Sequence, residues 1–299
     1  YQDKYKEKRG NVMNTTTMVP FVKWAGGKRQ MLEQLCIRMP DTYNAYYEPF
    51  VGGGAMVLSL APEKARINDI NQELVHTYTE IRDHLDALLE KLMELDKVTC
   101  TREFYYELRS RYNEKRLNSS YDTEMAALFI YLNKHCFNGL YRVNTKGEFN
   151  VPWNQKQSIR SMDMENIKAI SAYLKSVTIT CQDFEQALAG VQKGDFIYFD
   201  SPYAPLNPTS FDSYTKEGFT EEEHRRLAEL FRELTKKGVY CMLTNHNTEL
   251  IQELYEGFLI EEIDVRRAIN SDPKKRRGKE VIIRNYGEAI RPKRRTRKK

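Results

Sequence analysis

The amino-acid sequence predicts an α/β fold built on a parallel sheet, with a mostly helical region inserted into it. Short β-rich segments end in turn residues and alternate with longer amphipathic stretches, which is the pattern of βαβ units. The alternation lapses between about residues 71 and 158, where helices are followed by one hairpin-like segment. With 299 residues, of which 40% are hydrophobic and 30% charged, the chain has the length and composition of one large or two moderate globular domains.

The predicted strands are short apolar runs bounded by turn residues, and the predicted helices are longer amphipathic runs. The strands are, in chain order, Tyr46–Glu48, Lys64–Asn68, Val177–Cys181, Asp195–Phe199, Val239–Leu243, Phe258–Val265 and Glu280–Asn285. The helices are Gly27–Arg38, Asn71–Leu95, Thr101–Glu114, Thr123–Cys136, Asp163–Leu174, Thr220–Lys236 and Thr248–Tyr255. Thr220 and Glu223 have the spacing of a capping box, which places a helix start at Thr220. A turn at Thr145-Lys146-Gly147 predicts a hairpin over Leu140–Pro152.

The cysteines and histidines do not have the spacing of a metal site. The five cysteines stand far apart without any Cys-x-x-Cys pair, and no two of the five histidines have the i, i+4 spacing. We therefore expect no metal cofactor, and we expect reduced thiols in a cytoplasmic compartment. No apolar run approaches the roughly 18 residues of a membrane span, so we expect no membrane partner.

Positive charge is concentrated at the C-terminal end of the sequence. The segment Arg291–Lys299 holds seven basic residues and no acidic one, so without it the formal net charge of +5 becomes −2. A basic tail of this kind is either a solvated arm or a contact to nucleic-acid phosphates, and charge totals leave both readings open.

A glycine loop follows the first predicted strand. Glu48-Pro49-Phe50-Val51-Gly52-Gly53-Gly54 leads from that strand into the apolar run Ala55–Leu60. Glycines let the backbone approach a ligand closely at a helix start. The next strand ends before Asp69, whose carboxylate can accept hydrogen bonds from a ribose. Together they favour a ligand site over the alternative of a plain glycine turn and helix N-cap, and they do not fit the Gly-x-Gly-x-x-Gly pattern of nicotinamide dehydrogenases.

A carboxylate ends the apolar strand Phe196–Phe199, where a buried strand would normally end on neutral turn residues. The segment continues as Asp200-Ser201-Pro202-Tyr203. In this arrangement Asp200 could accept a hydrogen bond from an exocyclic amine while Tyr203 stacks on the ring that carries it. The alternative is a structural Asp-Ser-Pro turn with Tyr203 packed on the core.

Two further segments carry residues that could bind a ligand or DNA. Lys23-Trp24-Ala25-Gly26-Gly27-Lys28 lacks the Ser or Thr that follows the lysine of a phosphate loop, so its lysines either meet a carboxylate or a base edge or are solvated. The hairpin and the residues before it, Phe137–Arg142, could enter a DNA major groove, with Arg142 on a guanine edge, or could be purely structural.

Taken together and in this order, these four segments resemble the Dam-type (D12 class, alpha group) family of N6-adenine-specific DNA methyltransferases. The similarity runs from about Pro20 to Tyr286. It implies a Rossmann-like S-adenosylmethionine-dependent methyltransferase fold with an inserted helical and β-hairpin DNA-recognition domain. The implied divisions are an N-terminal tail (1–18), a discontinuous catalytic domain (19–71 and 159–288), a target-recognition domain (72–158) and a basic C-terminal tail (289–299).

The resemblance also implies roles for single residues. Those implied to bind S-adenosylmethionine are Trp24, Lys28, Phe50, Gly52, Gly54, Asp69, Asp183, Phe184 and Asp200. The catalytic set is Asp200, Pro202 and Tyr203, acting on an adenine flipped out of duplex DNA. Those implied to bind DNA are Lys23, Phe137, Asn138, Leu140, Arg142 and Pro152.

The chain departs from the family pattern at a few positions. Ser201 replaces the first proline of Asp-Pro-Pro-Tyr, Phe137 stands where tyrosine can occur, and Asn154-Gln155 replaces a frequent Gly-Arg. Two alternatives stay open: a weakened DNA-binding protein, and an amine methyltransferase acting on cytosine N4 or on a non-DNA substrate. The resemblance further suggests a GATC target, a nucleoid-associated monomer, and a cognate restriction endonuclease as partner.

Overall fold

The computed structural model describes residues 18–26, 28, 30–206, 219–266 and 277–289. Its strands are β1 (Tyr46–Glu48), β2 (Ala65–Asn68), β3 (Thr178–Thr180), β4 (Phe196–Phe199), β5 (Tyr240–His246), β6 (Leu259–Arg266) and β7 (Arg277–Arg284). Its helices are α2 (Leu32–Cys36), α3 (Ala55–Leu60), α4 (Gln72–Asp83), α5 (Leu85–Asp96), α6 (Arg102–Leu117), α7 (Thr123–His135), η1 (Phe137–Gly139), α8 (Met164–Leu174), α9 (Phe184–Ala187), α10 (Glu221–Lys236) and α11 (Glu249–Leu254). The two predicted tails, apart from Met18 and Ala289, lie outside the described residues.

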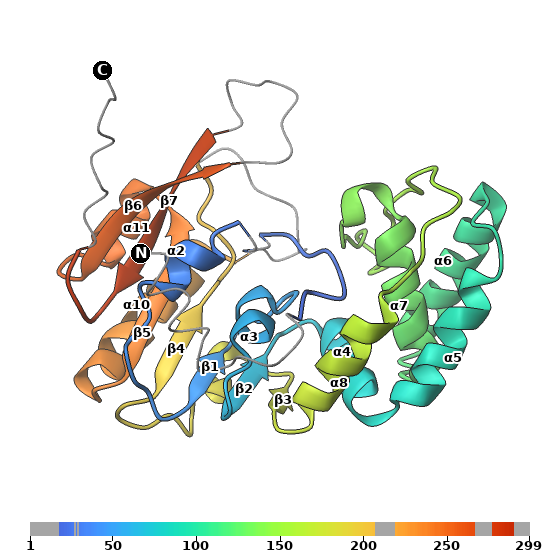
Figure 1. The fold of residues 1–299 in the computed structure, drawn as a ribbon. Helices are drawn as coiled ribbons and strands as arrows, with labels where there is room; N and C mark the ends of the chain where they lie inside the picture. The colour runs from blue at the N-terminus through green and yellow to red at the C-terminus, as the bar shows by residue number, and fades with distance from the viewer. Residues whose placement is uncertain (1–17, 27, 29, 207–218, 267–276, 290–299) are drawn as a thin grey trace, which may run out of the picture.

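All seven predicted strands join one sheet, in the order β3-β2-β1-β4-β5-β7-β6. The neighbours from β3 to β5 are parallel, whereas β7 runs antiparallel to both β5 and β6. The strand order reverses between β1 and β4, which are adjacent although far apart in the sequence (Figure 1). Ligands bind at such a switch point, beyond the carboxyl ends of the strands. The predicted α/β fold is confirmed.

Both faces of the sheet are covered at its centre, where β1 and β4 are buried along their whole length. Along β4, Phe196 and Tyr198 face one core with α2, α3 and the helices from α4 to α8. Ile197 and Phe199 face the other core, with α9, α10 and α11. Successive side chains of a strand point to opposite faces, so a strand covered on both sides is buried at every position.

The inserted helices lie together at the β3 end of the sheet, opposite β6 and β7 (Figure 1). Helix α7 is their centre, with a run of buried residues from Met125 to Asn133. A helix that is apolar on all sides is stable only when other helices surround it. Phe104 of α6 packs edge to face on its Tyr131, with ring centroids 6.2 Å apart.

Two of the predicted helices were wrong in extent. Among the described residues of the segment predicted as Gly27–Arg38, the helix covers Leu32–Cys36; Met31 before it provides no side-chain cap, and the Lys28 side chain is engaged with Asp200. The segment predicted as Asn71–Leu95 breaks at His84, whose φ of −128° and ψ of 39° are not helical. The capping box of Thr220 and Glu223 is present at the start of α10, as predicted.

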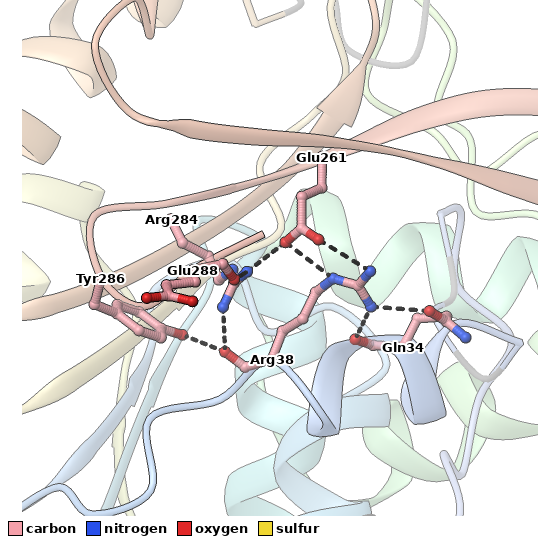
Figure 2. A network of polar contacts seen from close by, with 6 residues as sticks. All are labelled: Gln34, Arg38, Glu261, Arg284, Tyr286 and Glu288. Atoms are coloured by element: carbon pink, nitrogen blue, oxygen red, sulfur yellow. Dashed lines mark hydrogen bonds and ion pairs between the residues drawn. The ribbon is translucent and has the colours of Figure 1, made fainter. Parts of the chain in front are cut away.

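A buried ion network fastens α2 to the last two strands (Figure 2). Glu261 of β6 accepts hydrogen bonds from Arg38, at 3.2 and 3.3 Å, and from Arg284 of β7. The Arg38 backbone carbonyl in turn accepts from the Tyr286 hydroxyl at 3.0 Å. The three charged side chains are at most 9% exposed. Because a buried charge is costly without a partner, this network fixes how the segment after Lys28 sits on the sheet.

The predicted hairpin is present as an irregular antiparallel ribbon. Val143 bridges Phe149, and the turn closes with a hydrogen bond from the Gly147 N–H to the Asn144 carbonyl, 2.9 Å. The base of the ribbon is anchored on helix α6, where the Asn113 side chain accepts from the Phe149 N–H at 2.8 Å.

Candidate active site

The end of β4 delivers Asp200 to a position where other polar groups meet it. Its Oδ1 lies 2.8 Å from the Lys28 ammonium and accepts a hydrogen bond from the Thr244 hydroxyl of β5 at 3.0 Å. The Lys28 ammonium also donates to the Gly26 carbonyl at 2.6 Å. Lys28 is 5% and Asp200 19% exposed at the side chain, so their interaction is little screened by solvent. The turn after β4 and the segment Lys23–Lys28 therefore form one site.

The protonation of Asp200 depends on two opposing effects. Burial raises the pKa of Asp200, and the positive charge of Lys28 limits the increase. The hydrogen bond from Thr244 acts in the same direction as Lys28. Lys28 thus favours the ionised carboxylate, which is the form that can only accept hydrogen bonds.

Tyr203 stands beside Asp200, with its ring centroid 4.5 Å from the Lys28 ammonium. Its hydroxyl donates to Glu280 Oε2 at 2.8 Å, and its ring meets the His246 ring edge to face, with centroids 4.8 Å apart. An ammonium on the face of a phenol ring is a favourable cation–π arrangement. The amine of Lys28 thus contacts both the carboxylate and the aromatic ring of the turn.

The two residues between them differ in exposure. Pro202 is exposed, whereas Ser201 is 2% exposed and its hydroxyl has no hydrogen-bond partner within the part of the chain that the structure describes. A buried hydroxyl without a partner costs about 1–3 kcal/mol. The buried Ser201 hydroxyl is thus a cost to the fold that no contact among the described residues offsets.

The glycine loop at the end of β1 is shaped by its own neighbours. Gly52 and Gly54 have φ values of 48° and 71°, which favour glycine. A Cβ on Gly52 would lie 2.7 Å from the Trp24 ring, and one on Gly54 would lie 2.5 Å from the Tyr78 hydroxyl. Trp24 itself stacks on Tyr141, with centroids 5.3 Å apart. The loop, the lysine segment and the ribbon therefore contact one another through Trp24.

Glu48 at the end of β1 is a buried carboxyl that the sequence reasoning did not single out. Burial raises its pKa to about 8, and the Asp200 charge adds to this while the Tyr46 hydrogen bond opposes it. Glu48 Oε2 accepts from the Tyr46 hydroxyl at 2.8 Å and from the Val57 N–H at 3.1 Å. The side chain thus links β1 to the first turn of α3.

Asp69 supports the loop directly, since its carboxylate accepts from the Gly52 N–H and from the Asn71 N–H, both at 2.9 Å. Asn68 donates to the Pro49 and Gln182 carbonyls, at 3.0 and 2.9 Å. The ends of β1, β2 and β3 are therefore tied together at one edge. Next to Asp69, the Ile70 side chain is 73% exposed.

An aromatic cluster includes residues that follow β1 and β3. The rings of Phe50, Phe184 and Phe219 lie 5.4 to 6.1 Å apart. Asp183 caps α9 through the Glu185 N–H at 3.0 Å and pairs with Arg226, whose guanidinium lies over Phe184 at 4.3 Å. Phe50 and Phe184 come together as a pair, while the Asp183 carboxylate is turned to Arg226.

Of the residues implied to bind DNA, all but Leu140 are exposed. The Lys23 N–H donates to Asn133 at 2.8 Å, and the Lys23 side chain lies against Gly139, so Lys23 adjoins the turn containing Phe137 and Asn138. The Phe137 N–H donates to the Pro152 carbonyl at 2.7 Å. Phe137 is 52% exposed, and Lys23, Asn138, Arg142 and Pro152 are exposed as well. Leu140 is partly buried against the core, and Arg142 holds Asn150 across the ribbon at 2.8 Å.

Thr244, His246 and Glu280 are the contacts of this site that sequence reasoning missed. The first two lie beyond the predicted end of β5, and Glu280 was placed in a strand without a role. The polar run Thr244-Asn245-His246 after an apolar strand was the available signal. Across the described ranges, no group of three or more His, Cys, Asp or Glu side chains could hold a metal ion, and no helix is long and apolar enough to cross a membrane.

Comparison with known proteins gives consistent results. Residues 24–269 match the family described as D12 class N6 adenine-specific DNA methyltransferase. The chain is 44% identical to a type II methyltransferase of Lactococcus lactis subsp. cremoris over 279 residues, covering 92% of this chain and 98% of the relative. It is 41% identical to a type II methyltransferase of Methanocaldococcus jannaschii over 286 residues, covering 89% and 99%. It is 32% identical to a DNA adenine methylase of Haemophilus influenzae over 272 residues, covering 90% and 93%.

Proposed function

Because the chain belongs to the D12 class of N6 adenine-specific DNA methyltransferases, we propose that it transfers a methyl group from S-adenosylmethionine to the N6 amine of an adenine flipped out of duplex DNA. The observation that carries this proposal is the polar turn at the end of β4. There Asp200 lies 2.8 Å from an amine, that of Lys28, which also contacts the ring of Tyr203. A group that binds one amine beside an aromatic ring has the chemistry to bind the amine of a stacked base.

The residues at the ends of β1 to β3 fit the proposed cofactor. Glycines at 52 and 54, aromatic rings at 50 and 184 and the carboxylate of Asp69 provide close backbone approach, a surface for an adenine and an acceptor for ribose hydroxyls. Trp24, which lies against the loop, would complete this group. S-adenosylmethionine would supply an electrophilic methyl group on a sulfonium. Asp183 would join the site only by sharing its carboxylate with Arg226.

Asp200 and the backbone carbonyl of Ser201 would accept hydrogen bonds from the adenine N6 amine, and Tyr203 would stack on the base. Pro202 would stiffen the turn between them. The Asp200 carboxylate would orient the amine by accepting a hydrogen bond from its N–H group. The nitrogen lone pair would then be free to accept the methyl group. Positioning of this kind, without a covalent enzyme intermediate, would provide most of the rate. Lys28, assigned by resemblance to the cofactor group, would keep Asp200 ionised.

Recognition is assigned to the exposed residues around the ribbon: Lys23, Phe137, Asn138, Arg142 and Pro152, together with Leu140. The exposed ring of Phe137 is suited to enter a base stack, and Arg142 to read a guanine. GATC is the proposed target. Since two relatives are named type II methyltransferases, we propose that a restriction endonuclease of the same specificity is the partner, and that the enzyme acts as a monomer in the cytoplasm.

Methyl transfer from labelled S-adenosylmethionine to unmethylated genomic DNA, followed by mapping of the modified bases, tests this proposal. We expect N6-methyladenine at GATC. Modification at another adenine motif would overturn the target alone, whereas N4-methylcytosine, or no transfer to DNA by a folded protein, would overturn the proposed reaction.

A further inference from the structure

Tyr203 is held in place by residues of the sheet rather than by its own element. It follows β4 in a segment without helix or strand, so its own backbone gives the ring little support. Two contacts from neighbouring strands fix it: the hydrogen bond to Glu280 at 2.8 Å and the edge-to-face contact with His246 at 4.8 Å. Glu280 holds the hydroxyl end of the ring, and His246 contacts the ring itself.

The two supporting residues are a cross-strand pair. His246 of β5 is directly opposite Glu280 of β7 in the antiparallel register. Opposed residues of an antiparallel pair point to the same face of the sheet, so a single register places both against the same ring. Because β4 and β7 both neighbour β5, the strand order brings this pair to the turn that leaves β4.

The backbone after Tyr203 is anchored to the same strand. The Ala204 N–H donates to the Asn245 side chain at 2.8 Å, and His246 Nδ1 lies 2.8 Å from the Ala204 carbonyl, which it can reach only as a donor. The contacts on Tyr203 and on Ala204 therefore restrain the ring and the following peptide together. A ring restrained in advance loses less side-chain entropy when a base stacks on it.

We infer that Glu280, supported by its cross-strand partner His246, is a positioning residue for methyl transfer: its carboxylate holds the Tyr203 hydroxyl and thereby keeps the ring beside Asp200 in the orientation that stacks on the target adenine. This inference rests on the stacking role proposed for Tyr203. Glu280 acts through Tyr203 and does not itself touch the reacting atoms.

A double-mutant cycle tests the inference. Tyr203→Phe removes the hydroxyl, Glu280→Ala removes the acceptor, and Glu280→Gln keeps an oxygen that can accept. We expect Tyr203→Phe and Glu280→Ala each to lower kcat by about ten- to a hundredfold, the size of one hydrogen bond to a charged group. Their combination should be no worse than either alone, and Glu280→Gln should retain most of the activity. Cofactor affinity should be unchanged in all of them.

A second measurement follows the base itself. The fluorescence of 2-aminopurine at the target adenine reports its stacking, and it should change in Glu280→Ala and Tyr203→Phe alike. Glu262→Gln, an exposed carboxylate change on the adjacent strand, is the matched control and should behave as the wild type. Multiplicative effects in the cycle, or a loss in Glu280→Ala with an unaffected Tyr203→Phe, would overturn the inference.

Tyr203→Ala separates this inference from the proposed function. If Tyr203→Ala methylates DNA at the wild-type rate, the stacking role fails, and the inference fails with it. If Tyr203→Ala is inactive while Glu280→Ala is fully active, only the inference fails. Thermal unfolding of each variant distinguishes loss of activity from loss of the fold.

Discussion

Among single residues, the contact between Lys28 and Asp200 links a residue assigned to the cofactor group with one assigned to catalysis. The lysine belongs to a segment resembling a cofactor motif, yet its ammonium lies 2.8 Å from the carboxylate and 4.5 Å from the Tyr203 ring centroid. An incoming adenine amine would use the same two partners. In the proposed reaction, Lys28 would leave these two partners when the base enters.

Lys28→Met should shift the acid limb of the pH–rate profile to higher pH. Burial raises the pKa of Asp200 and Lys28 opposes this, so removal of the ammonium lets the pKa rise further. The ionised fraction of Asp200, and with it kcat/KM, is then lost at a higher pH as the solution is acidified. Lys28→Arg keeps the charge and serves as the control. An acid limb that is the same in Lys28→Met and wild type would contradict the electrostatic role.

Glu48→Gln should remove a pH-dependent loss of stability. Burial raises the folded-state pKa of Glu48 to about 8, against an unfolded value of 4.5. Between these two pH values only the folded protein holds the proton, so stability falls as the pH rises, by up to about 1.4 kcal/mol per unit. Denaturant unfolding of both proteins at pH 5 and at pH 8 measures this. A wild-type stability that is level or rises across that interval, relative to Glu48→Gln, would refute it.

Among the elements, α2 is short, and a buried network of ion pairs next to its end helps to hold it against the sheet. Helix α2 is five residues long, and its Gln34 accepts hydrogen bonds from Arg38, two residues beyond its end, which shares Glu261 with Arg284 (Figure 2). Since α2 follows Lys28 in the sequence, the network also limits where the lysine can reach.

Glu261→Gln should destabilise the protein by about 3–5 kcal/mol, because it leaves two arginines buried without a counter-charge. The adjacent Glu262 provides a matched control, since it pairs with Lys279 at the surface, where the side chains are 39% and 63% exposed. Glu262→Gln should leave the stability close to that of the wild type, because a solvent-exposed ion pair contributes little. Equal losses for the two variants in denaturant unfolding would show that burial does not govern the network.

The ribbon is the element to which base recognition is assigned. Arg142→Ala should weaken discrimination at one base pair by about 1–3 kcal/mol, the size of a bidentate guanine contact. Lys146→Ala, at the exposed tip of the same ribbon, is the control and should leave sequence preference unchanged. Methylation rates on substrates with each target base substituted in turn measure both. An unchanged preference in Arg142→Ala would place recognition on another element.

At the scale of the whole molecule, the site exists because the strand order places β1 beside β4 and β5 beside β7. The strands and the carboxyl-end residues Gly52, Gly54, Asp69 and Asp200 could be predicted, because each follows a local apolar run. The contacts of Lys28, Thr244 and Glu280 could not, because they depend on which strands become neighbours. The break at His84 could not be predicted either, because the helical periodicity continues through it.

Asp200 is the residue on which the proposed methyl transfer depends most directly. The most direct measurement compares wild type and Asp200→Ala for methyl transfer to duplex DNA and for affinity toward S-adenosylmethionine in the same preparation. We predict that transfer falls to background while the protein stays folded and still binds S-adenosylmethionine. Transfer by Asp200→Ala at the wild-type rate would contradict it.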